Sequence, residues 1–571
     1  MACAAPFQIT GEINVKVLNL AILSTLFVAG SSSAVETAAT QQGSKLLHDW
    51  PHIPSTIGKD PAIEARVKEI LGQMTLAQKI GQMTQPEIKF ISPDQVRRFY
   101  IGSVLNGGGS WPAQNKHAVV GDWLALAEAY HQASMSTDAK VQVPVIWGTD
   151  AVHGNSNVRG ATLFPHNIGL GAARDPELIE RIGEATGRAT RATGIGWVFA
   201  PTLAVAQDPR WGRTYESFSS EGALVRDYAA VYVRGLQGSF KDDGNVVATA
   251  KHYIGDGATE YGRDQGESVV TRTEMINVHG HFGALGAGAQ TVMASFNSWN
   301  DVASGVNHGK MHGSHALLTE ALKDKMGFDG FVVSDWNGIA QVPGCINASC
   351  PQAINAGIDM VMVPEDWQAF ITNTTRQVNS GEIPLARIDD AVTRILRVKL
   401  RTGMFNQKPS DSRHAGNAEA LLDRDLARRA VRESLVLLKN EDAALPLKRD
   451  QRILVVGKSA DNYANQAGGW SLTWQGTENV NADYLHADTV LAALHEAAGK
   501  DQVVFSETGK SIDPASYDVI VAVIGETPYA ETNGDIVASD TLSHSRRHPE
   551  DLQVLQAAAA SGKPVVTVFF S

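Results

Sequence analysis

The chain has 571 residues, 43% of them hydrophobic, and its 61 acidic and 49 basic side chains give a formal net charge of −12. This length accommodates more than one hydrophobic core, since domains average about 150 residues. The acidic balance, without a run of Lys and Arg, argues against a nucleic-acid partner. No apolar segment reaches the roughly 20 residues of a membrane span, so we expect a soluble mature protein.

The N-terminus has the pattern of a secretory signal. Residues 17–28 follow a lysine and are mostly apolar, and residues 29–34 are small. This order is typical of a signal peptide and its cleavage region. Glu12 and Asn19 depart from the pattern, and a disordered leader is the alternative. We assign residues 1–55 to a signal peptide and leader, and we predict export to the periplasm or the medium.

The three cysteines predict one disulfide. Cys3 lies in the leader, whereas Cys345 and Cys350 are five residues apart in a loop-like segment. In an exported protein such a pair can close a small ring, and we expect it to do so. A zinc site at this pair is not expected, because companion ligands at a suitable spacing are missing.

Short apolar runs alternate with helix-length segments over residues 56–405. This alternation, without hairpin signals, predicts a parallel sheet, and the number of repeats favours closure into a (β/α)8 barrel of the TIM type. The expected strands are residues 101–105, 143–147, 195–200, 246–250, 291–296, 331–333 and 358–363. The expected helices include residues 63–74, 176–193, 223–237, 273–285, 315–325 and 387–401.

Polar, charged or aromatic side chains follow each predicted strand. Because the carboxyl ends of barrel strands meet at one rim, a single small ligand could contact all of them. These side chains include Asn106, Asp150, His153, Thr202, Lys251, His252, Asn297, Trp299, Asp335, Trp336 and Glu365.

Asp335 and Trp336 end the most abrupt of these runs. A carboxylate at the rim can act as a base, a nucleophile or a metal ligand, and an adjacent indole offers an apolar wall on which a sugar ring can stack. The alternative is that Asp335 only caps the following helix.

A second α/β unit is expected over residues 425–571, after a linker at residues 406–424. Residues 422–438 read as a helix that runs into a strand, and further elements are expected at 452–457, 489–498, 519–525 and 564–571. Because the chain stops in a predicted buried strand, we expect a truncated chain in which this unit lacks its last strands.

Three further segments have compositions that can carry chemistry. The acidic loop at residues 525–535 could reach over a pocket of the other domain, or it is a solvated turn. Residues 107–109 are all glycine but lack the spacing of a phosphate-binding loop. The three histidines at positions 308, 312 and 315 are interpreted as loop or packing residues and not as metal ligands.

An ordered set of motifs resembles family 3 of the glycoside hydrolases, nearest to its β-glucan exohydrolases and β-glucosidases. The resemblance runs from about residue 60 to the end of the chain. The motifs are MTLAQKIGQM at 74–83, DAVHG at 150–154, FPHN at 164–167, DPRWGR at 208–213 with YES at 215–217, AKH at 250–252, SDW at 334–336, GGW at 468–470, WQG at 474–476 and GETPYAE at 525–531.

The resemblance implies a retaining β-glucosidase whose site lies between a (β/α)8 barrel and an α/β sandwich domain. By the family motif, Asp335 is the nucleophile and Glu531 the general acid and base, and no cofactor or metal is expected. The resemblance also implies groups that bind the terminal glucose and an aromatic pair that clamps the next sugar. The first set is Asp150, Arg213, Lys251, His252 and Met293, and the pair is Trp336 and Trp474.

Two departures from the family and several alternatives stay open. Phe296 stands where the plant exohydrolases have a tyrosine, and residues 337–341 differ from the plant pattern, which leaves β-1,3 and β-1,4 linkages open. Glu526 competes with Glu531 as the acid. Alternatives within the family are a β-xylosidase and a β-N-acetylglucosaminidase, although the loop at 251–257 lacks the histidine of the latter's dyad. A carbohydrate-binding protein without hydrolysis is the alternative from another class.

Overall fold

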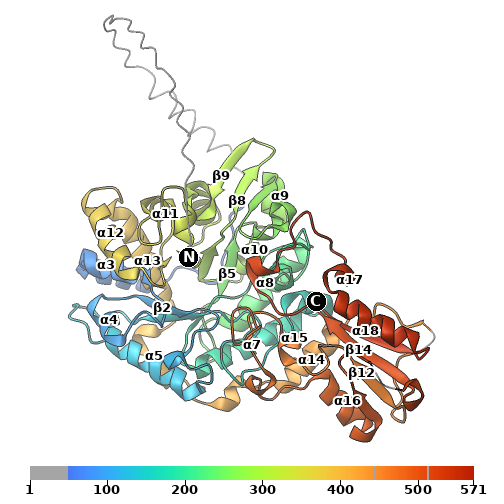
Figure 1. The fold of residues 1–571 in the computed structure, drawn as a ribbon. Coiled ribbons are helices and arrows are strands. Elements are labelled where there is room, and N and C mark those ends of the chain that lie inside the picture. Colours follow the sequence, from blue (N-terminus) through green and yellow to red (C-terminus); the bar gives the residue numbers. More distant parts are fainter. Residues whose placement is uncertain (1–48, 442–443, 511–512) are drawn as a thin grey trace, which may run out of the picture. The chain divides into compact units, whose positions relative to one another are not determined.

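A computed structural model describes residues 49–441, 444–510 and 513–571, and Figure 1 shows its fold. The predicted signal sequence lies outside the described residues. Residues from Trp50 to Ser571 form one compact unit.

Eight short parallel strands form a closed barrel. Ladder pairs join β2 to β3, β3 to β4, β5 to β7, β7 to β10 and β11 to β1. Parallel bridges close the three remaining gaps, at Glu87 with Leu105, Trp197 with Val247, and Val333 with Met360. The strands are β1 (Thr84–Gln85), β2 (Ser103–Asn106), β3 (Ile146–Thr149), β4 (Trp197–Val198), β5 (Thr249–Tyr253), β7 (Thr291–Ala294), β10 (Phe331–Val333) and β11 (Val361–Met362).

The sequence pattern found seven of these strands and missed β1. Thr84 and Gln85 carry no apolar run, yet both are fully buried. Both side chains donate hydrogen bonds inside the barrel: Thr84 donates to the Ile80 carbonyl at 2.8 Å, and Gln85 donates to Ser103 Oγ at 2.8 Å. A buried polar strand gives no periodic hydrophobic signal.

Helices occupy most of the connections between the strands. The start of α7 illustrates the local reason: Asp175 caps the amides of Glu177 and Leu178, and Pro176 stands in the first turn, where a proline is tolerated. The helices are α2 (Pro61–Gln73), α3 (Leu76–Gln82), α4 (Pro93–Arg98), α5 (Val120–Ser134), α6 (Asn167–Ala173), α7 (Pro176–Ala192), α8 (Gly222–Gln237), α9 (Arg272–Asn277), α10 (Phe282–Gly286), α11 (Pro351–Ala356), α12 (Trp367–Asn379) and α13 (Leu385–Arg401), with a π-helix at Ala316–Lys325.

A small extra sheet was not predicted. Strand β6 (Glu267–Val270) pairs parallel with β8 (Ser298–Asp301), and β8 pairs antiparallel with β9 (Val306–Lys310). The expectation of parallel strands without a hairpin is therefore wrong at residues 298–310. The reason is that this hairpin is an insertion after β7, with a turn at 302–305 that lacks the usual two-residue signal.

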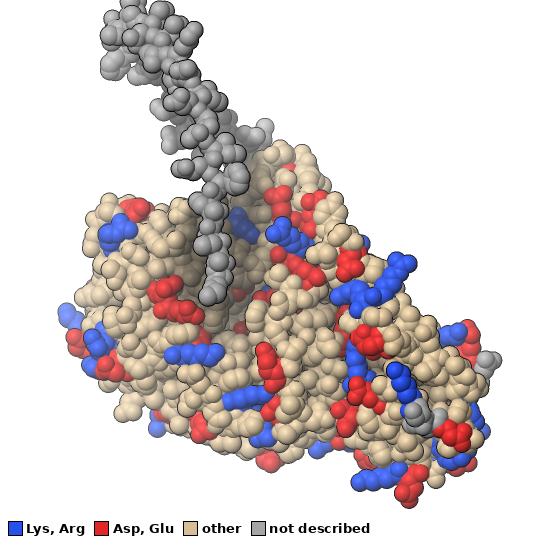
Figure 2. All heavy atoms as spheres, in the orientation of Figure 1, with Lys and Arg blue, Asp and Glu red and all other residues tan. Residues whose placement is uncertain are grey.

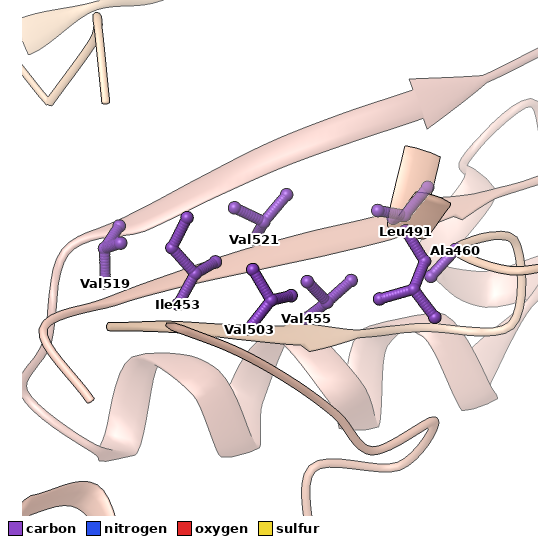
Figure 3. Packing of buried hydrophobic residues seen from close by; sticks show 8 residues of the cluster. Ile453, Val455, Ala460, Leu491, Val503, Val519 and Val521 are labelled. Carbon is purple, nitrogen blue, oxygen red and sulfur yellow. The ribbon is translucent and has the colours of Figure 1, made fainter. Parts of the chain in front are cut away.

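The second sheet has four parallel strands in the order β13 (Val503–Phe505), β12 (Ile453–Val456), β14 (Val519–Gly525) and β15 (Val565–Phe570). Side chains from β12, β13 and β14 pack with Leu491 of α16 (Val490–Ala498) on one face, as Figure 3 shows. On the other face, Ala558 of α18 (Pro549–Ala560) packs against Leu454 and Ile520. The two central strands, β12 and β14, are buried and apolar on both sides because helices cover both faces.

The predicted strand at the end of residues 422–438 does not form. Helix α14 (Arg424–Ser434) ends there, and Leu435 and Leu438 are 71% and 89% exposed. The apolar run Leu435 to Leu438 pairs with no strand among the described residues. An apolar run indicates a strand only where a partner strand lies beside it.

The loop between β10 and α11 contains the predicted Cys345–Cys350 disulfide, which the structure confirms. A ring closed across five positions of sequence should stabilise the chain by about 2 kcal/mol, mainly by restricting the unfolded state. We expect the double substitution Cys345→Ser, Cys350→Ser to lower the midpoint of urea unfolding, and reductant to have little further effect on that variant. Reactive thiols from this pair in a denatured, unreduced Cys3→Ser chain would contradict the bridge.

Surface and helix composition add two observations. No helix in the described part of the chain is long and apolar enough to span a bilayer. On the face drawn in Figure 2, acidic and basic side chains are interspersed.

Candidate active site

Asp335 lies two residues after the end of β10, where the backbone leaves the barrel. Its backbone N–H donates to His312 Nε2 at 3.0 Å, and its Oδ1 accepts from the Trp336 backbone N–H at 2.7 Å. Its other oxygen, Oδ2, is buried and has no hydrogen-bond partner among the described residues. Burial raises the pKa of Asp335 to about 6, although Arg213 and Lys251 act against that rise. One carboxylate oxygen is thus held in place and the other is free to react.

His252 stands between two carboxyl groups. Its Nε2 lies 3.6 Å from Asp335 Oδ2, and its Nδ1 lies 2.8 Å from Asp256 Oδ2. Burial, together with the charges of Arg213 and Lys251, holds the pKa of His252 well below its usual range. Burial also raises the pKa of Asp256 to about 7. A neutral imidazole can donate one hydrogen bond and accept another, which suits a group that orients a polar ligand.

Lys251 and Asp150 form an ion pair beside His252. Lys251 belongs to β5 and Asp150 follows β3, and Lys251 Nζ lies 2.9 Å from Asp150 Oδ1. The lysine side chain is only 2% exposed, whereas the aspartate retains 15%. The accessible end of this pair is therefore the carboxylate.

Arg213 links two glutamates from different parts of the chain. Its Nε and Nη2 each donate to Glu216 at 2.9 Å, and its Nη1 donates to Glu531 Oε1 at 3.2 Å. Glu216 is fully buried, and it also accepts from Trp470 Nε1 at 3.1 Å. A buried guanidinium that is bidentate with one carboxylate has a fixed orientation, so it presents its third nitrogen to Glu531 in one geometry.

Glu531 comes from the second sheet, in the loop after β14. Burial raises its pKa to about 8, the charges of Asp335, Asp264 and Glu216 raise it too, and Arg213 opposes the rise. Asp335 and Glu531 are therefore close enough for the charge of one to affect the proton of the other. The backbone of Glu531 is left-handed, with φ of +56°, which costs an L-residue about 1–2 kcal/mol.

Contacts with the barrel hold the Glu531 loop in this conformation. Asp535 accepts from the backbone N–H groups of Gly212 at 2.8 Å and Asp264 at 2.9 Å. Thr532 Oγ1 donates to Asp264 Oδ2 at 3.1 Å. A Cβ on Gly212 would stand 2.0 Å from the Glu531 carbonyl oxygen. A glycine is thus needed at position 212 for the loop to approach the barrel.

Trp336 and Trp474 flank the glycines of residues 107–109. A Cβ on Gly107 would lie 2.9 Å from the Trp336 ring, and one on Gly108 would lie 2.9 Å from Trp474 Cα. The two indoles are 37% and 41% exposed, which is unusual for tryptophan in a large domain. These glycines therefore allow two chain segments to approach closely.

The remaining predicted residues lie in other surroundings. Met293 is buried in β7, only 2% exposed. The competing acid Glu526 accepts from Tyr529 at 2.7 Å and from Arg547 at 3.4 Å, not from Arg213. Phe296 packs near His312, with ring centroids 5.9 Å apart.

Sequence reasoning missed three residues of this cluster. His312 was interpreted as a loop or packing histidine, yet it accepts the backbone N–H of Asp335. Glu216 and Asp256 were not singled out, and they hold Arg213 and His252. Glu216 lies in the YES motif and Asp256 in the loop at 251–257, but neither position indicated which side chain it would hold.

Comparison with known proteins places the chain among glycosyl hydrolases. Residues 75–398 match the model for the "Glycosyl hydrolase family 3 N terminal domain", and residues 435–571 match the corresponding C-terminal domain.

Two curated relatives and one solved structure are similar over most of the chain. A "Lysosomal beta glucosidase" of Dictyostelium discoideum is 33% identical to this chain, and the aligned region covers 88% of this chain and 65% of the relative. A "Periplasmic beta-glucosidase" of Salmonella typhimurium is 27% identical, and the aligned region covers 89% of this chain and 68% of the relative. The exo-1,3/1,4-beta-glucanase from a Pseudoalteromonas species, whose crystal structure is known, is 47% identical in sequence and superposes with a TM-score of 0.86. The superposed region covers 91% of this chain and 65% of the glucanase chain. The chain thus spans about two thirds of the length of these proteins.

Proposed function

The chain belongs to family 3 of the glycosyl hydrolases, and on this premise we propose that it is a retaining, exo-acting β-glucosidase. It releases glucose from the non-reducing end of β-glucosides and β-gluco-oligosaccharides. The observation that carries the proposal is the pair Asp335 and Glu531, one with a free carboxylate oxygen and the other with a pKa raised to about 8. The names of the relatives, two β-glucosidases and an exo-β-glucanase, support the same activity.

In the proposed reaction Asp335 is the nucleophile. Its free Oδ2 attacks the anomeric carbon while Glu531 donates its proton to the leaving oxygen, so a glycosyl ester forms and the aglycone departs neutral. Water then attacks the anomeric carbon and gives a proton to Glu531, and the bond from that carbon to Asp335 breaks, which frees glucose and restores the Asp335 carboxylate and the Glu531 acid. Each step inverts the configuration at the anomeric carbon, so the released glucose keeps the β-configuration of the substrate.

The groups around the pair suit recognition of one terminal glucose. We assign Asp150, Arg213, Lys251 and His252 to the sugar hydroxyls, because charge-assisted hydrogen bonds hold a polyol strongly. Met293 completes this set as an apolar contact in the barrel wall. We assign Trp336 and Trp474 to the next sugar, since exposed indoles stack on the apolar faces of a pyranose.

The pH dependence of hydrolysis tests the two acid roles. Asp335 must be ionised and Glu531 protonated, and their pKa values are raised to about 6 and about 8. We expect kcat/KM to rise as the pH passes about 6 and to fall as it passes about 8, with a plateau between. Because Asp335 and Glu531 influence each other's titration, the two inflections are properties of the pair and not of one residue each. A flat profile of kcat/KM from about pH 5 to 9 would contradict the assignment.

Substrate profiling tests the activity itself. We expect the purified chain to hydrolyse an aryl β-glucoside, and to release glucose one unit at a time from laminari- and cello-oligosaccharides, with the β-anomer appearing first by NMR. Aryl β-xylosides and β-N-acetylglucosaminides are the matched controls and should react more slowly. Binding of the oligosaccharides without release of glucose would indicate a carbohydrate-binding protein instead.

Export is part of the proposal. The predicted signal sequence and the Cys345–Cys350 disulfide both suit an oxidising compartment, and one relative carries the word periplasmic in its name. Cell fractionation of an expressing bacterium should place the activity outside the cytoplasm.

A further inference from the structure

A second cluster of potential ligands lies on the second sheet. Glu526 directly follows β14, His544 opens α17 (His544–Arg547), and His548 precedes α18. One donor atom from each of the three side chains lies within 4.8 Å of the others, and no other group of three such residues was found in the described ranges. Figure 1 shows α17 and α18 next to β14.

Each histidine of this cluster has a carboxylate on one ring nitrogen. His544 Nε2 lies 2.8 Å from Asp551 Oδ2, and His548 Nδ1 lies 3.4 Å from Glu550 Oε1. The remaining nitrogens are His544 Nδ1 and His548 Nε2, and the latter is buried without a hydrogen-bond partner among the described residues. A carboxylate on the outer nitrogen is the usual arrangement of a metal-ligating histidine, because it fixes the tautomer and the ring.

The two histidine rings of the cluster lie close together. Their imidazoles are stacked, with centroids 4.4 Å apart and ring planes at 27°.

Both carboxylate oxygens of Glu526 already have a partner. Arg547 lies 3.4 Å from Glu526 Oε1, a long contact that a metal can displace, and Tyr529 donates to Oε2 at 2.7 Å. Lys458 contacts Glu550 at 2.9 Å and Asp551 at 3.3 Å, so it binds only the outer carboxylates.

We propose that Glu526, His544 and His548 form a binding site for one divalent transition metal of the zinc type, with water as the fourth ligand. Two imidazoles and one carboxylate are a known zinc set, and donor atoms on a tetrahedral zinc ion stand about 3.4 Å apart. The three donor atoms lie within 4.8 Å of one another, so the side chains would have to rotate toward one another when zinc binds.

The site lies at the root of the loop that carries Glu531. Glu526 is bound by Tyr529, whose carbonyl accepts from Tyr215 of the barrel at 2.7 Å. Gly534 packs so closely on the Tyr529 ring that an added Cβ would lie 2.2 Å from it. A metal on Glu526 therefore braces residues 526–535, and its relevance to catalysis rests on the proposed role of Glu531.

Zinc binding to the tag-free full chain tests the site. After dialysis against ZnCl2 and then metal-free buffer, we expect about one tightly held zinc per chain, and a rise in Tm that depends on zinc concentration. His544→Ala and His548→Ala should abolish both, and Asp551→Asn should weaken binding roughly 10- to 100-fold. The matched control is His495→Ala, in the same sheet unit, which should bind zinc as the wild type does.

Two outcomes would overturn the proposal: no zinc retained by the wild type, or equal retention by His544→Ala, His548→Ala and His495→Ala. If an alanine variant fails to fold by circular dichroism, His548→Gln replaces it, since an amide keeps the polarity but is a poor zinc ligand. The brace is tested by hydrogen exchange of residues 526–535, which zinc should slow. This readout does not need hydrolysis, so it separates failure of the metal site from failure of the proposed function.

Discussion

Asp335→Asn is expected to abolish hydrolysis while the chain stays folded. An amide is not a nucleophile, so no glycosyl ester forms, and kcat should fall on the order of 10⁴- to 10⁶-fold, as when other enzymes lose their nucleophile. The fold should persist because Oδ2 has no hydrogen-bond partner among the described residues, and the backbone N–H bond to His312 does not depend on the side chain. Release of nitrophenol and the Tm measure the two effects.

Asp324→Asn is the matched control for that substitution. Asp324 is an exposed acid on the π-helix just before β10, and its loss should leave kcat unchanged. Residual hydrolysis by Asp335→Asn within about tenfold of the wild type would remove Asp335 from the nucleophile's role.

Glu531→Gln is expected to slow the hydrolysis of substrates with poor leaving groups far more than that of substrates with good ones. Natural disaccharides need a proton on the departing oxygen, and kcat for them should fall about 10²- to 10⁴-fold. A dinitrophenyl β-glucoside departs without that proton, so its first step should proceed near the wild-type rate. Azide, which needs no general base, should accelerate turnover of the ester in this variant only.

The control for Glu531→Gln is Glu507→Gln, an exposed glutamate of the same sheet unit, which should treat both substrates as the wild type does. If Glu531→Gln cleaves disaccharides at the wild-type rate and Glu526→Gln shows the dependence on leaving group, the acid is Glu526. The contacts argue for Glu531, because Arg213 binds Glu531, whereas Arg547 and Tyr529 bind Glu526.

The barrel was predictable where its strands were apolar, and it was missed where they were not. β10 ends at Val333, two positions before Asp335, as the run of residues 331–333 indicated, because a strand buried on both faces must be continuously apolar. Thr84 and Gln85 escaped detection because hydrogen bonds, not hydrophobic burial, stabilise them there. At residues 435–438 the error was the opposite, an apolar run without a neighbouring strand. The predicted limits of the two domains and the linker at 406–424 stay a prediction.

The site was predictable in its residues but not in its connections. Family motifs pointed to Asp335, Arg213 and Lys251, because each lies in a recognisable string. The partners of these residues come from other parts of the chain and are brought near only by folding. No spacing in the sequence indicates that His312 approaches Asp335, which is 23 positions away. The role of residues 107–109 could not be inferred either, because a glycine indicates that another segment can approach closely but not which segment does.

The bridge from Asp535 to Gly212 and Asp264 has a consequence during synthesis of the chain. A ribosome that has completed all eight barrel strands has made the proposed nucleophile and the sugar-binding groups, but no proton donor. The nascent protein is therefore expected to stay inert until β14 and the segment after it have emerged and folded.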